Sequence, residues 1–170
     1  MLASDKLIDA FNTQTGRELG ASHQYIAIAS YFDRENLPEL SRFFYRQAAE
    51  ERGHALKFVR FVNDVEGVVR IPEVPAPKGD FSSAEEAVAL SLDWEKEVTE
   101  QIYGLVDIAR GESNHIALRF LDWFVTEQLE EVNTMSTLLG VVRRAGEDGL
   151  LNVENYLARE QGALGSEAAP

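Results

Sequence analysis

Four glutamates interrupt apolar stripes at positions where a core residue is expected. Reading the chain in steps of seven gives one stripe for each of four helical segments. The stripes are Phe11, Glu18, Tyr25, Phe32; Phe44, Glu51, Phe58, Val65; Val88, Glu95, Ile102, Ala109; and Ala117, Phe124, Glu131, Leu138. A parallel stripe, Leu121, Gln128, Met135, Val142, runs along the last segment. Each polar interruption lies near the middle of its stripe, so the four acids are expected at one level of a helical core.

Acids at one level of a core need compensating charge. Burying several carboxylates close together is strongly unfavourable unless cations neutralise them. Glu18, Glu51, Glu95 and Glu131 carry four formal negative charges, which two divalent cations would balance. The only basic side chain in the set is His54, which follows Glu51 by three residues and lies on the same helix face. A Glu plus Glu-x-x-His arrangement is known from di-iron and di-manganese carboxylate proteins, so the sequence predicts a two-metal site.

The spacing of these residues repeats in the second half of the chain. Glu51 follows Glu18 by 33 residues, and Gln128 follows Glu95 by 33 residues. Each of these later residues has a further possible ligand three positions on. The chain therefore reads as two related helical hairpins, each offering one acid and then a pair of polar side chains one turn apart.

Two other side chains lie close enough to the predicted site to take part in its chemistry. Tyr25 is two turns from Glu18 on the same stripe, where its phenol could hydrogen-bond a ligand or donate an electron. A core tyrosine with a satisfied hydroxyl explains the same position equally well. For Trp123, beside the ligand stripe, packing is favoured over a role as electron donor.

The elements that must position these residues are four long helices. Periodicity and capping residues predict helices over 4–34, 38–65, 83–110 and 113–144, with a short fifth helix over 150–160. Ser4 is a possible N-cap of the first helix, Pro38 fits the first turn of the second, and Ser82 and Ser83 each open a possible capping box. Residues 1–160 are expected to form one domain, and the small, polar residues 161–170 a disordered tail.

The connections between these helices predict their directions. Short loops join the first helix to the second and the third to the fourth, so each pair must be antiparallel. The linker over residues 66–81 can extend roughly 50 Å, comparable with the ~40–45 Å length of such a helix. It can therefore cross the whole bundle and leave the second and third helices parallel. The predicted fold class is all-α, a four-helix bundle with one long crossover and a short C-terminal fifth helix.

Composition excludes several classes of function. The chain has no cysteine, which rules out disulfides, zinc ribbons, iron–sulfur clusters and thiol catalysis. No apolar stretch is long enough for a membrane span, and the N-terminus lacks a signal-type pattern, so we expect a soluble cytoplasmic protein. The excess of 29 acidic over 16 basic residues repels nucleic acid and attracts cations. Taken alone, that excess is better explained by solubility.

The segments YIAIASYFD, FFYRQAAEERGHA, FLDWFVTEQLEEV and VENYLARE resemble bacterial non-haem ferritins, most closely the actinobacterial type. The resemblance covers about residues 4–160 and implies the ferritin-like fold. It implies one iron held by Glu18, Glu51 and His54, and a second held by Glu51, Glu95 and Glu131, with Glu51 bridging. Gln128 matches a glutamine of the family. With Glu131, the acids that match a nearby third iron site are Glu50, Glu127 and Glu130, which also read as an exposed acidic run.

The resemblance further implies iron storage by a ferroxidase. Fe(II) would be oxidised by dioxygen, or by peroxide, and deposited as ferric mineral inside a shell of 24 identical subunits. The fifth helix would lie at the fourfold axis and the turn over residues 111–115 at the threefold axis. Because the amide of Gln128 is neutral, we expect the second iron to be held weakly enough to leave. Unchanged iron affinity and turnover in a Gln128→Glu variant would contradict this hypothesis.

Related and competing classes fit the sequence less well. Bacterioferritins bind haem through a methionine that follows the first Glu of Glu-x-x-His, whereas Arg52 follows Glu51 here and Met135 lies on a core stripe. No haem is therefore expected. Rubrerythrin-like proteins add a cysteine-ligated iron domain, and miniferritins place their ligands between subunits. A di-metal oxygenase would need a substrate cavity beside the metals, and a purely structural assembly would tolerate loss of Glu51 and His54.

Overall fold

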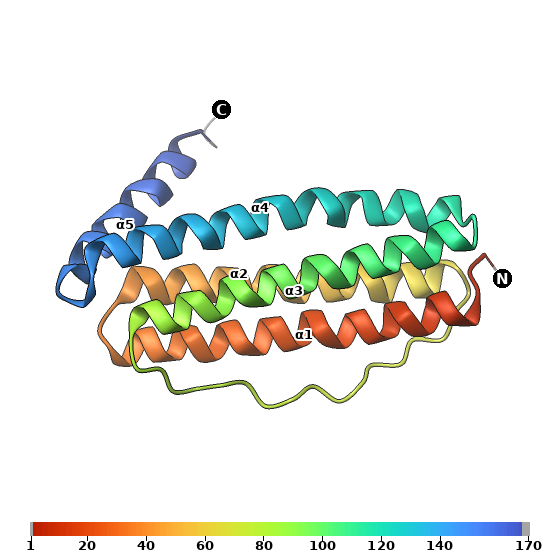
Figure 1. The fold of residues 1–170 in the computed structure, drawn as a ribbon, viewed down its shortest axis with the longest axis horizontal. Helices are drawn as coiled ribbons and strands as arrows, with labels where there is room; N and C mark the ends of the chain where they lie inside the picture. Colours follow the sequence, from red (N-terminus) through yellow and green to blue (C-terminus); the bar gives the residue numbers. More distant parts are fainter. Residues whose placement is uncertain (1, 168–170) are drawn as a thin grey trace.

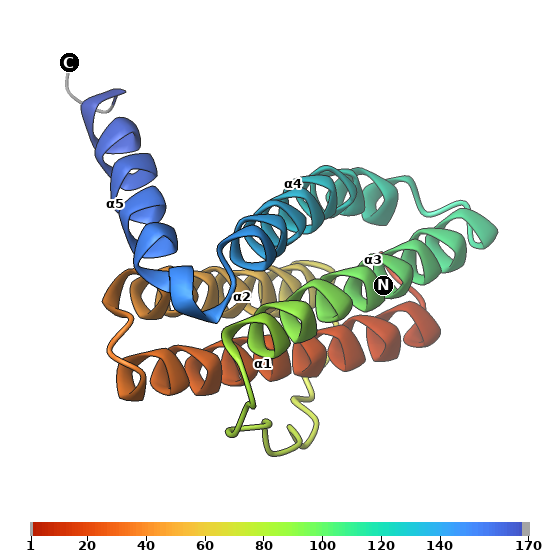
Figure 2. The ribbon, with the colours of Figure 1, turned by 60° about the vertical axis from the view of Figure 1, so that its left-hand side comes forward.

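Four long helices lie side by side in the computed structural model, and a fifth leaves the bundle at one end (Figures 1 and 2). The structure describes the backbone of residues 2–167 and the side chains of residues 2–160. The elements are α1 (Asp5–Arg34), α2 (Pro38–Asp64), α3 (Ala84–Gly111), α4 (His115–Ala145), a 3-10 turn (Glu147–Gly149) and α5 (Leu150–Glu167). The prediction of an all-α, four-helix bundle with a C-terminal fifth helix is confirmed. Within the described residues, no helix is long and apolar enough to cross a membrane.

The helix ends follow the capping residues of the sequence closely. Ser4 accepts a hydrogen bond from the Leu7 amide at the start of α1, and Ser83 accepts one from the Glu86 amide at the start of α3. The cap of α4 is Asn114, one residue later than the predicted start. α5 continues beyond its predicted end near residue 160. The last residues of the predicted tail, 168–170, lie outside the described part of the chain, and disorder of this tail stays a prediction.

The crossover between α2 and α3 runs the length of the bundle along α1, so α2 and α3 are parallel as predicted (Figure 1). Two buried amide side chains of α1 fasten it. Asn12 donates to the Val68 carbonyl at 2.9 Å and accepts from the Arg70 amide at 3.0 Å. Gln24 donates to the Lys78 carbonyl at 2.8 Å and accepts from its amide at 2.9 Å. Each pair of bonds replaces backbone hydrogen bonds that an extended segment cannot make with itself.

The segment after α4 is fastened by two acids to the adjacent first turns of α2 and α3. Glu154 of α5 accepts hydrogen bonds from the Glu39 and Leu40 amides at 2.8 and 2.9 Å, where α2 has no side-chain cap of its own. Glu147 accepts from the Ala84 amide at 3.1 Å. Free amides at helix N-termini favour negative charge. Acids distant in sequence therefore cap the first turns of α2 and α3.

The apolar core is divided into two clusters by a band of buried polar side chains. One cluster includes Tyr25, Phe44 and Met135, and the other includes Phe11 and Phe58. On each of the four long helices a buried acid separates the residues of one cluster from those of the other. The predicted site is thus enclosed between two packed apolar halves.

Replacing Gly16 by alanine is expected to destabilise the fold, although alanine is the better helix former. A Cβ atom at Gly16 would lie 2.2 Å from the Pro72 ring of the crossover, so the crossover must shift. We expect a loss of about 1–3 kcal/mol in the free energy of unfolding, measured by denaturant titration. The matched control is Gly104→Ala in α3, where a Cβ meets nothing within 4 Å and a gain of up to ~1 kcal/mol is expected. Equal effects of the two substitutions would show that the crossover does not pack closely against α1 at Gly16.

Candidate metal centre

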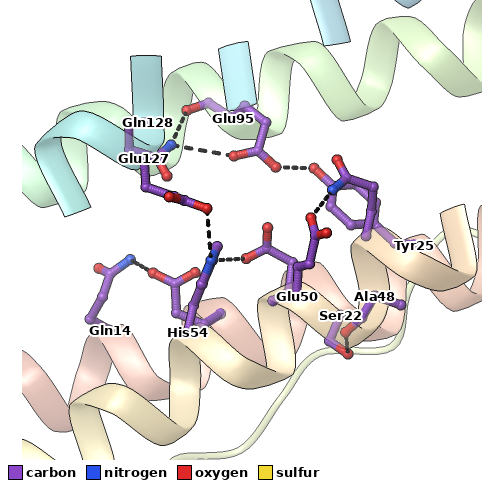
Figure 3. A network of polar contacts seen from close by, with 12 residues as sticks. Gln14, Ser22, Tyr25, Ala48, Glu50, His54, Glu95, Glu127 and Gln128 are labelled. Carbon is purple, nitrogen blue, oxygen red and sulfur yellow. Dashed lines mark hydrogen bonds and ion pairs between the residues drawn. The ribbon is translucent and has the colours of Figure 1, made fainter. Parts of the chain in front are cut away.

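The predicted ligands meet at the middle of the bundle, one or two from each long helix, and Figure 3 shows His54, Glu95 and Glu127 around this place. α1 supplies Glu18, α2 supplies Glu51 and His54, α3 supplies Glu95, and α4 supplies Glu131. None of the five is more than 5% exposed. Their helices bring them together because each stripe turns its interrupted face toward the common core.

The five side chains form two groups that share Glu51. The possible ligand atoms of Glu18, Glu51 and His54 all lie within 4.8 Å of one another, and so do those of Glu51, Glu95 and Glu131. Ligand atoms at about 2.0–2.2 Å from one ion can be roughly 4 Å apart. Small side-chain movements would therefore let each group close around a cation.

A further group consists of His54, Glu127 and Glu131, whose possible ligand atoms also lie within 4.8 Å of one another. The two ring nitrogens of His54 face different acids. Nδ1 is 3.3 Å from Glu51 Oε2, and Nε2 is 3.6 Å from Glu127 Oε1. Among residues 2–160, no such group includes Glu50 or Glu130, both of which are exposed. Of the three acids assigned to a third iron site by resemblance, the structure brings Glu127 to the centre.

Two oxygens of the centre are buried without a hydrogen-bond donor: Glu18 Oε2 and Glu51 Oε1. A buried carboxylate oxygen that lacks a partner costs free energy, which is why such atoms are rare in native proteins. Both oxygens belong to the first ligand group, and Glu51 belongs to both groups. A bound cation would satisfy them, so the donor set fits a metal.

Burial raises the pKa of every carboxyl group in the set. The pKa values of Glu18 and Glu51 lie well above the ordinary range, first because of burial and then because of the neighbouring carboxylates Glu51 and Glu95, respectively. Burial also raises the pKa of Glu95. Burial, followed by repulsion from Glu95 and Glu50, raises the pKa of Glu131 to about 8. Without metal the centre therefore retains protons near neutral pH, and a cation must displace them to bind.

Tyr25 and Gln128 both donate to Glu95. The Tyr25 hydroxyl donates to Glu95 Oε1. Gln128 Nε2 lies 3.2 Å from the Glu95 carbonyl oxygen, 3.3 Å from Glu95 Oε2 and 3.2 Å from Thr99 Oγ1. The phenol is thus satisfied by a predicted ligand, which fits both interpretations of Tyr25. The amide group of Gln128 presents its nitrogen to the neighbouring acid.

Trp123 is not a core residue, because it is 40% exposed. Its ring meets the His54 ring edge-on, with centroids 5.4 Å apart. Lys57 Nζ lies over the Trp123 ring, 4.1 Å from the centroid. The tryptophan therefore covers the histidine from the solvent side. It has a packing role, as predicted, but at the surface of the bundle.

Sequence reasoning missed Gln14, which is fully buried and donates to Glu18 Oε1 at 2.8 Å. Its position four residues before Glu18 places both on one face of α1, and this spacing is the only signal that could have revealed it. It missed Gln47 as well, whose amide donates to Glu50 at the edge of the centre. Both glutamines hold acids rather than replace them.

Glu131→Gln is expected to stabilise the metal-free protein at pH 8 and to leave it nearly unchanged at pH 5. Because the folded protein holds the Glu131 proton up to a pKa of about 8, against 4.5 for the free group, its stability falls as the pH rises through that window. Each such carboxyl contributes a slope of at most about 1.4 kcal/mol per pH unit. Unfolding of chelator-treated wild type and variant at both pH values measures the difference. A stability difference between wild type and variant that does not change with pH would contradict the raised pKa of Glu131.

Comparison with known proteins places the chain in a family. Residues 8–145 match the ferritin-like domain. Ferritin BfrB of Mycolicibacterium smegmatis is 44% identical over 154 residues, 91% of this chain and 84% of that protein. The bacterial non-heme ferritin of Staphylococcus aureus is 39% identical over 147 residues, 86% of this chain and 89% of that protein. The open pore ferritin of Archaeoglobus fulgidus superposes with a TM-score of 0.89 at 32% identity, over 92% of this chain and 96% of that one. This chain therefore belongs to the ferritin family, as a bacterial ferritin of the actinobacterial type.

Proposed function

We propose that the protein is a ferroxidase that stores iron. Fe(II) is oxidised by dioxygen at a two-iron site within each chain, and the ferric product is deposited as mineral inside a hollow, cytoplasmic shell of many copies. The observation that carries this proposal is the pair of buried ligand groups joined by Glu51. Names of relatives that contain the word ferritin support the same function.

In this proposal iron is the substrate, and each ligand group holds one ion. Glu18, Glu51 and His54 hold the first, and Glu51, Glu95 and Glu131 hold the second. Carboxylates with a single imidazole suit Fe(II). The two buried oxygens without donors, Glu18 Oε2 and Glu51 Oε1, support these assignments. The shared carboxylate keeps the two ions close enough to react with one oxygen molecule.

The chemistry needs the protein mainly for geometry. Each Fe(II) gives up one electron, so two ions reduce one dioxygen molecule to hydrogen peroxide when two protons are taken up. Peroxide can itself accept two electrons from a second pair of Fe(II) ions and yield water. The carboxyl groups release their protons when Fe(II) binds, because their raised pKa values favour the protonated form when no cation is bound. No separate general base is needed.

Neighbouring residues have supporting roles in the proposal. Tyr25 and Gln128 hold the Glu95 carboxylate in place. Glu127, with Glu131, offers a further position for iron beside the pair, facing His54 Nε2. Exposed Glu50 and Glu130 then extend an acidic path along α2 and α4. Iron that has been oxidised can leave the pair along these acids.

We propose that the shell contains 24 copies of the chain. Two features support assembly. α5 stands away from the bundle (Figure 2), and its Leu151 is 72% exposed. Contact with another copy of the chain would bury this apolar side chain of the projecting helix. A light-scattering mass of the purified protein measures the number of copies directly.

An oxygenase that acts on an organic substrate is disfavoured by aromatic packing beside the centre. Phe11, Phe44, Phe58 and Phe124 are all at most 1% exposed. The rings of Phe58 and Phe124 stack with centroids 4.4 Å apart, and Phe58 meets Phe11 at 5.2 Å. These rings occupy the space on the ligand stripes that a substrate would need.

Aerobic addition of Fe(II), followed by sizing of the product, tests the proposed function. We expect the wild type to oxidise hundreds of Fe(II) ions per shell and retain them in a particle of unchanged outer size. Glu95→Gln should slow this oxidation at least ~100-fold, because a loss of one ligand disrupts the second ion. The matched control on the same helix is Glu100→Gln, an exposed acid outside the centre. A wild type that oxidises and keeps only two ions per chain would instead indicate a di-metal enzyme that acts on an organic substrate. A wild type that oxidises no Fe(II) would leave only a structural role.

A further inference from the structure

We propose that Gln14 is a positioning residue for the first iron: it fixes one oxygen of Glu18 so that the other is presented to the metal. This inference rests on the proposed function, because it concerns the same site. Gln14 is fully buried although it is polar and belongs to neither ligand group. A buried amide next to a predicted ligand needs a reason, because its polar atoms cost free energy unless each is paired.

The partners of Gln14 determine which way its amide group points. Arg17 NH1 donates to Gln14 Oε1 at 3.3 Å, and a guanidinium can only donate. The amide nitrogen must therefore face the opposite side. There it donates to Glu18 Oε1 at 2.8 Å and to Gln101 Oε1 at 3.3 Å. When Glu18 is ionised, as it must be to bind a metal, exchange of the amide oxygen and nitrogen would set two oxygens against each other at Glu18, so this orientation of the amide is the favourable one.

The consequence falls on the two oxygens of Glu18. Oε1 is held by the glutamine, whereas Oε2 is buried and has no donor. A carboxylate held in this way presents its free oxygen to the metal, and the hydrogen bond opposes rotation of the group away from the site. Loss of such a partner of a metal ligand typically lowers metal affinity by about 10–100-fold.

A glutamine also holds an acid of the second ligand group, but from a different helix. Gln128 of α4 donates to Glu95 of α3, whereas Gln14 donates to an acid one turn further along its own helix. The other oxygen of Glu95 accepts from the Tyr25 hydroxyl, so of these two acids only Glu18 keeps an oxygen without a donor. Gln14 therefore leaves Glu18 with one oxygen free for the metal.

Gln14→Met tests the role of Gln14. Methionine keeps the length and helix preference of glutamine but cannot donate. The matched control is Gln24→Met, which removes another buried amide of α1 that binds the crossover instead of the centre. The probe is Co(II), titrated without oxygen into the assembled protein and followed by its visible absorption bands. The Michaelis constant for Fe(II) is measured in parallel.

We expect Gln14→Met to weaken one of the two Co(II) binding steps about 10–100-fold, and to raise the Michaelis constant for Fe(II) by a similar factor while kcat changes less. Gln24→Met should lower thermal stability but leave both binding steps unchanged. Two tight steps in Gln14→Met, or an equal loss in the two variants, would overturn the proposal. If Gln14→Met does not fold, Gln14→Leu serves the same test. Normal Co(II) binding without Fe(II) oxidation in the wild type would contradict the proposed function and leave the positioning role standing.

Discussion

Four carboxyl groups at the centre of a helical bundle repel one another, and the rest of the molecule is organised around that repulsion. At the bundle core they can be charged only if cations lie between them. The raised pKa values of Glu18, Glu51, Glu95 and Glu131 express this constraint in the metal-free protein, where protons replace the missing cations. The two apolar clusters on either side offset the cost of burying these groups and hold them at one level.

The topology of the bundle also brings these carboxyl groups to one level. Two antiparallel hairpins with short loops each bring an acid beside an i, i+3 pair. The long crossover lets the hairpins pack with α2 and α3 parallel, so that their acids meet at half height. Apolar residues of this crossover such as Val68 and Ile71 are 60% exposed, so its attachment depends on the amide pairs of Asn12 and Gln24 and on the bare backbone at Gly16. The acids Glu147 and Glu154 do the same for the segment that follows α4.

The sequence predicted the helices and their directions, and it indicated which acids lie together in the core, because these features are periodic. An acid that recurs in register with an apolar stripe can be found without coordinates. The caps from Glu147 and Glu154 could not be predicted, because they join residues more than sixty positions apart in sequence. Gln14 was not predicted from the sequence for another reason. Its role depends on which way an amide points, and that is decided by Arg17, a surface residue without any motif.

The same limit applies to the acids at the edge of the centre. Glu127 and Glu130 lie on one helix three residues apart, and the sequence treats them alike. Only Glu127 faces the histidine, because the packing of α4 against α2 turns it inward. Gln128 was predicted from its spacing as a weak ligand, and the structure shows its amide nitrogen on Glu95. Its effect on the departure of iron stays a prediction.

In the proposed centre, one carboxylate, Glu51, joins two metal positions within a single chain. This can be tested by anaerobic titration of wild type and Glu51→Gln with ⁵⁷Fe(II), with bound ions counted by Mössbauer spectroscopy. We expect two ions per chain in the wild type and the loss of tight binding at both positions in the variant. A variant that keeps one ion at unchanged affinity, or a wild type that binds only one, would contradict the shared centre.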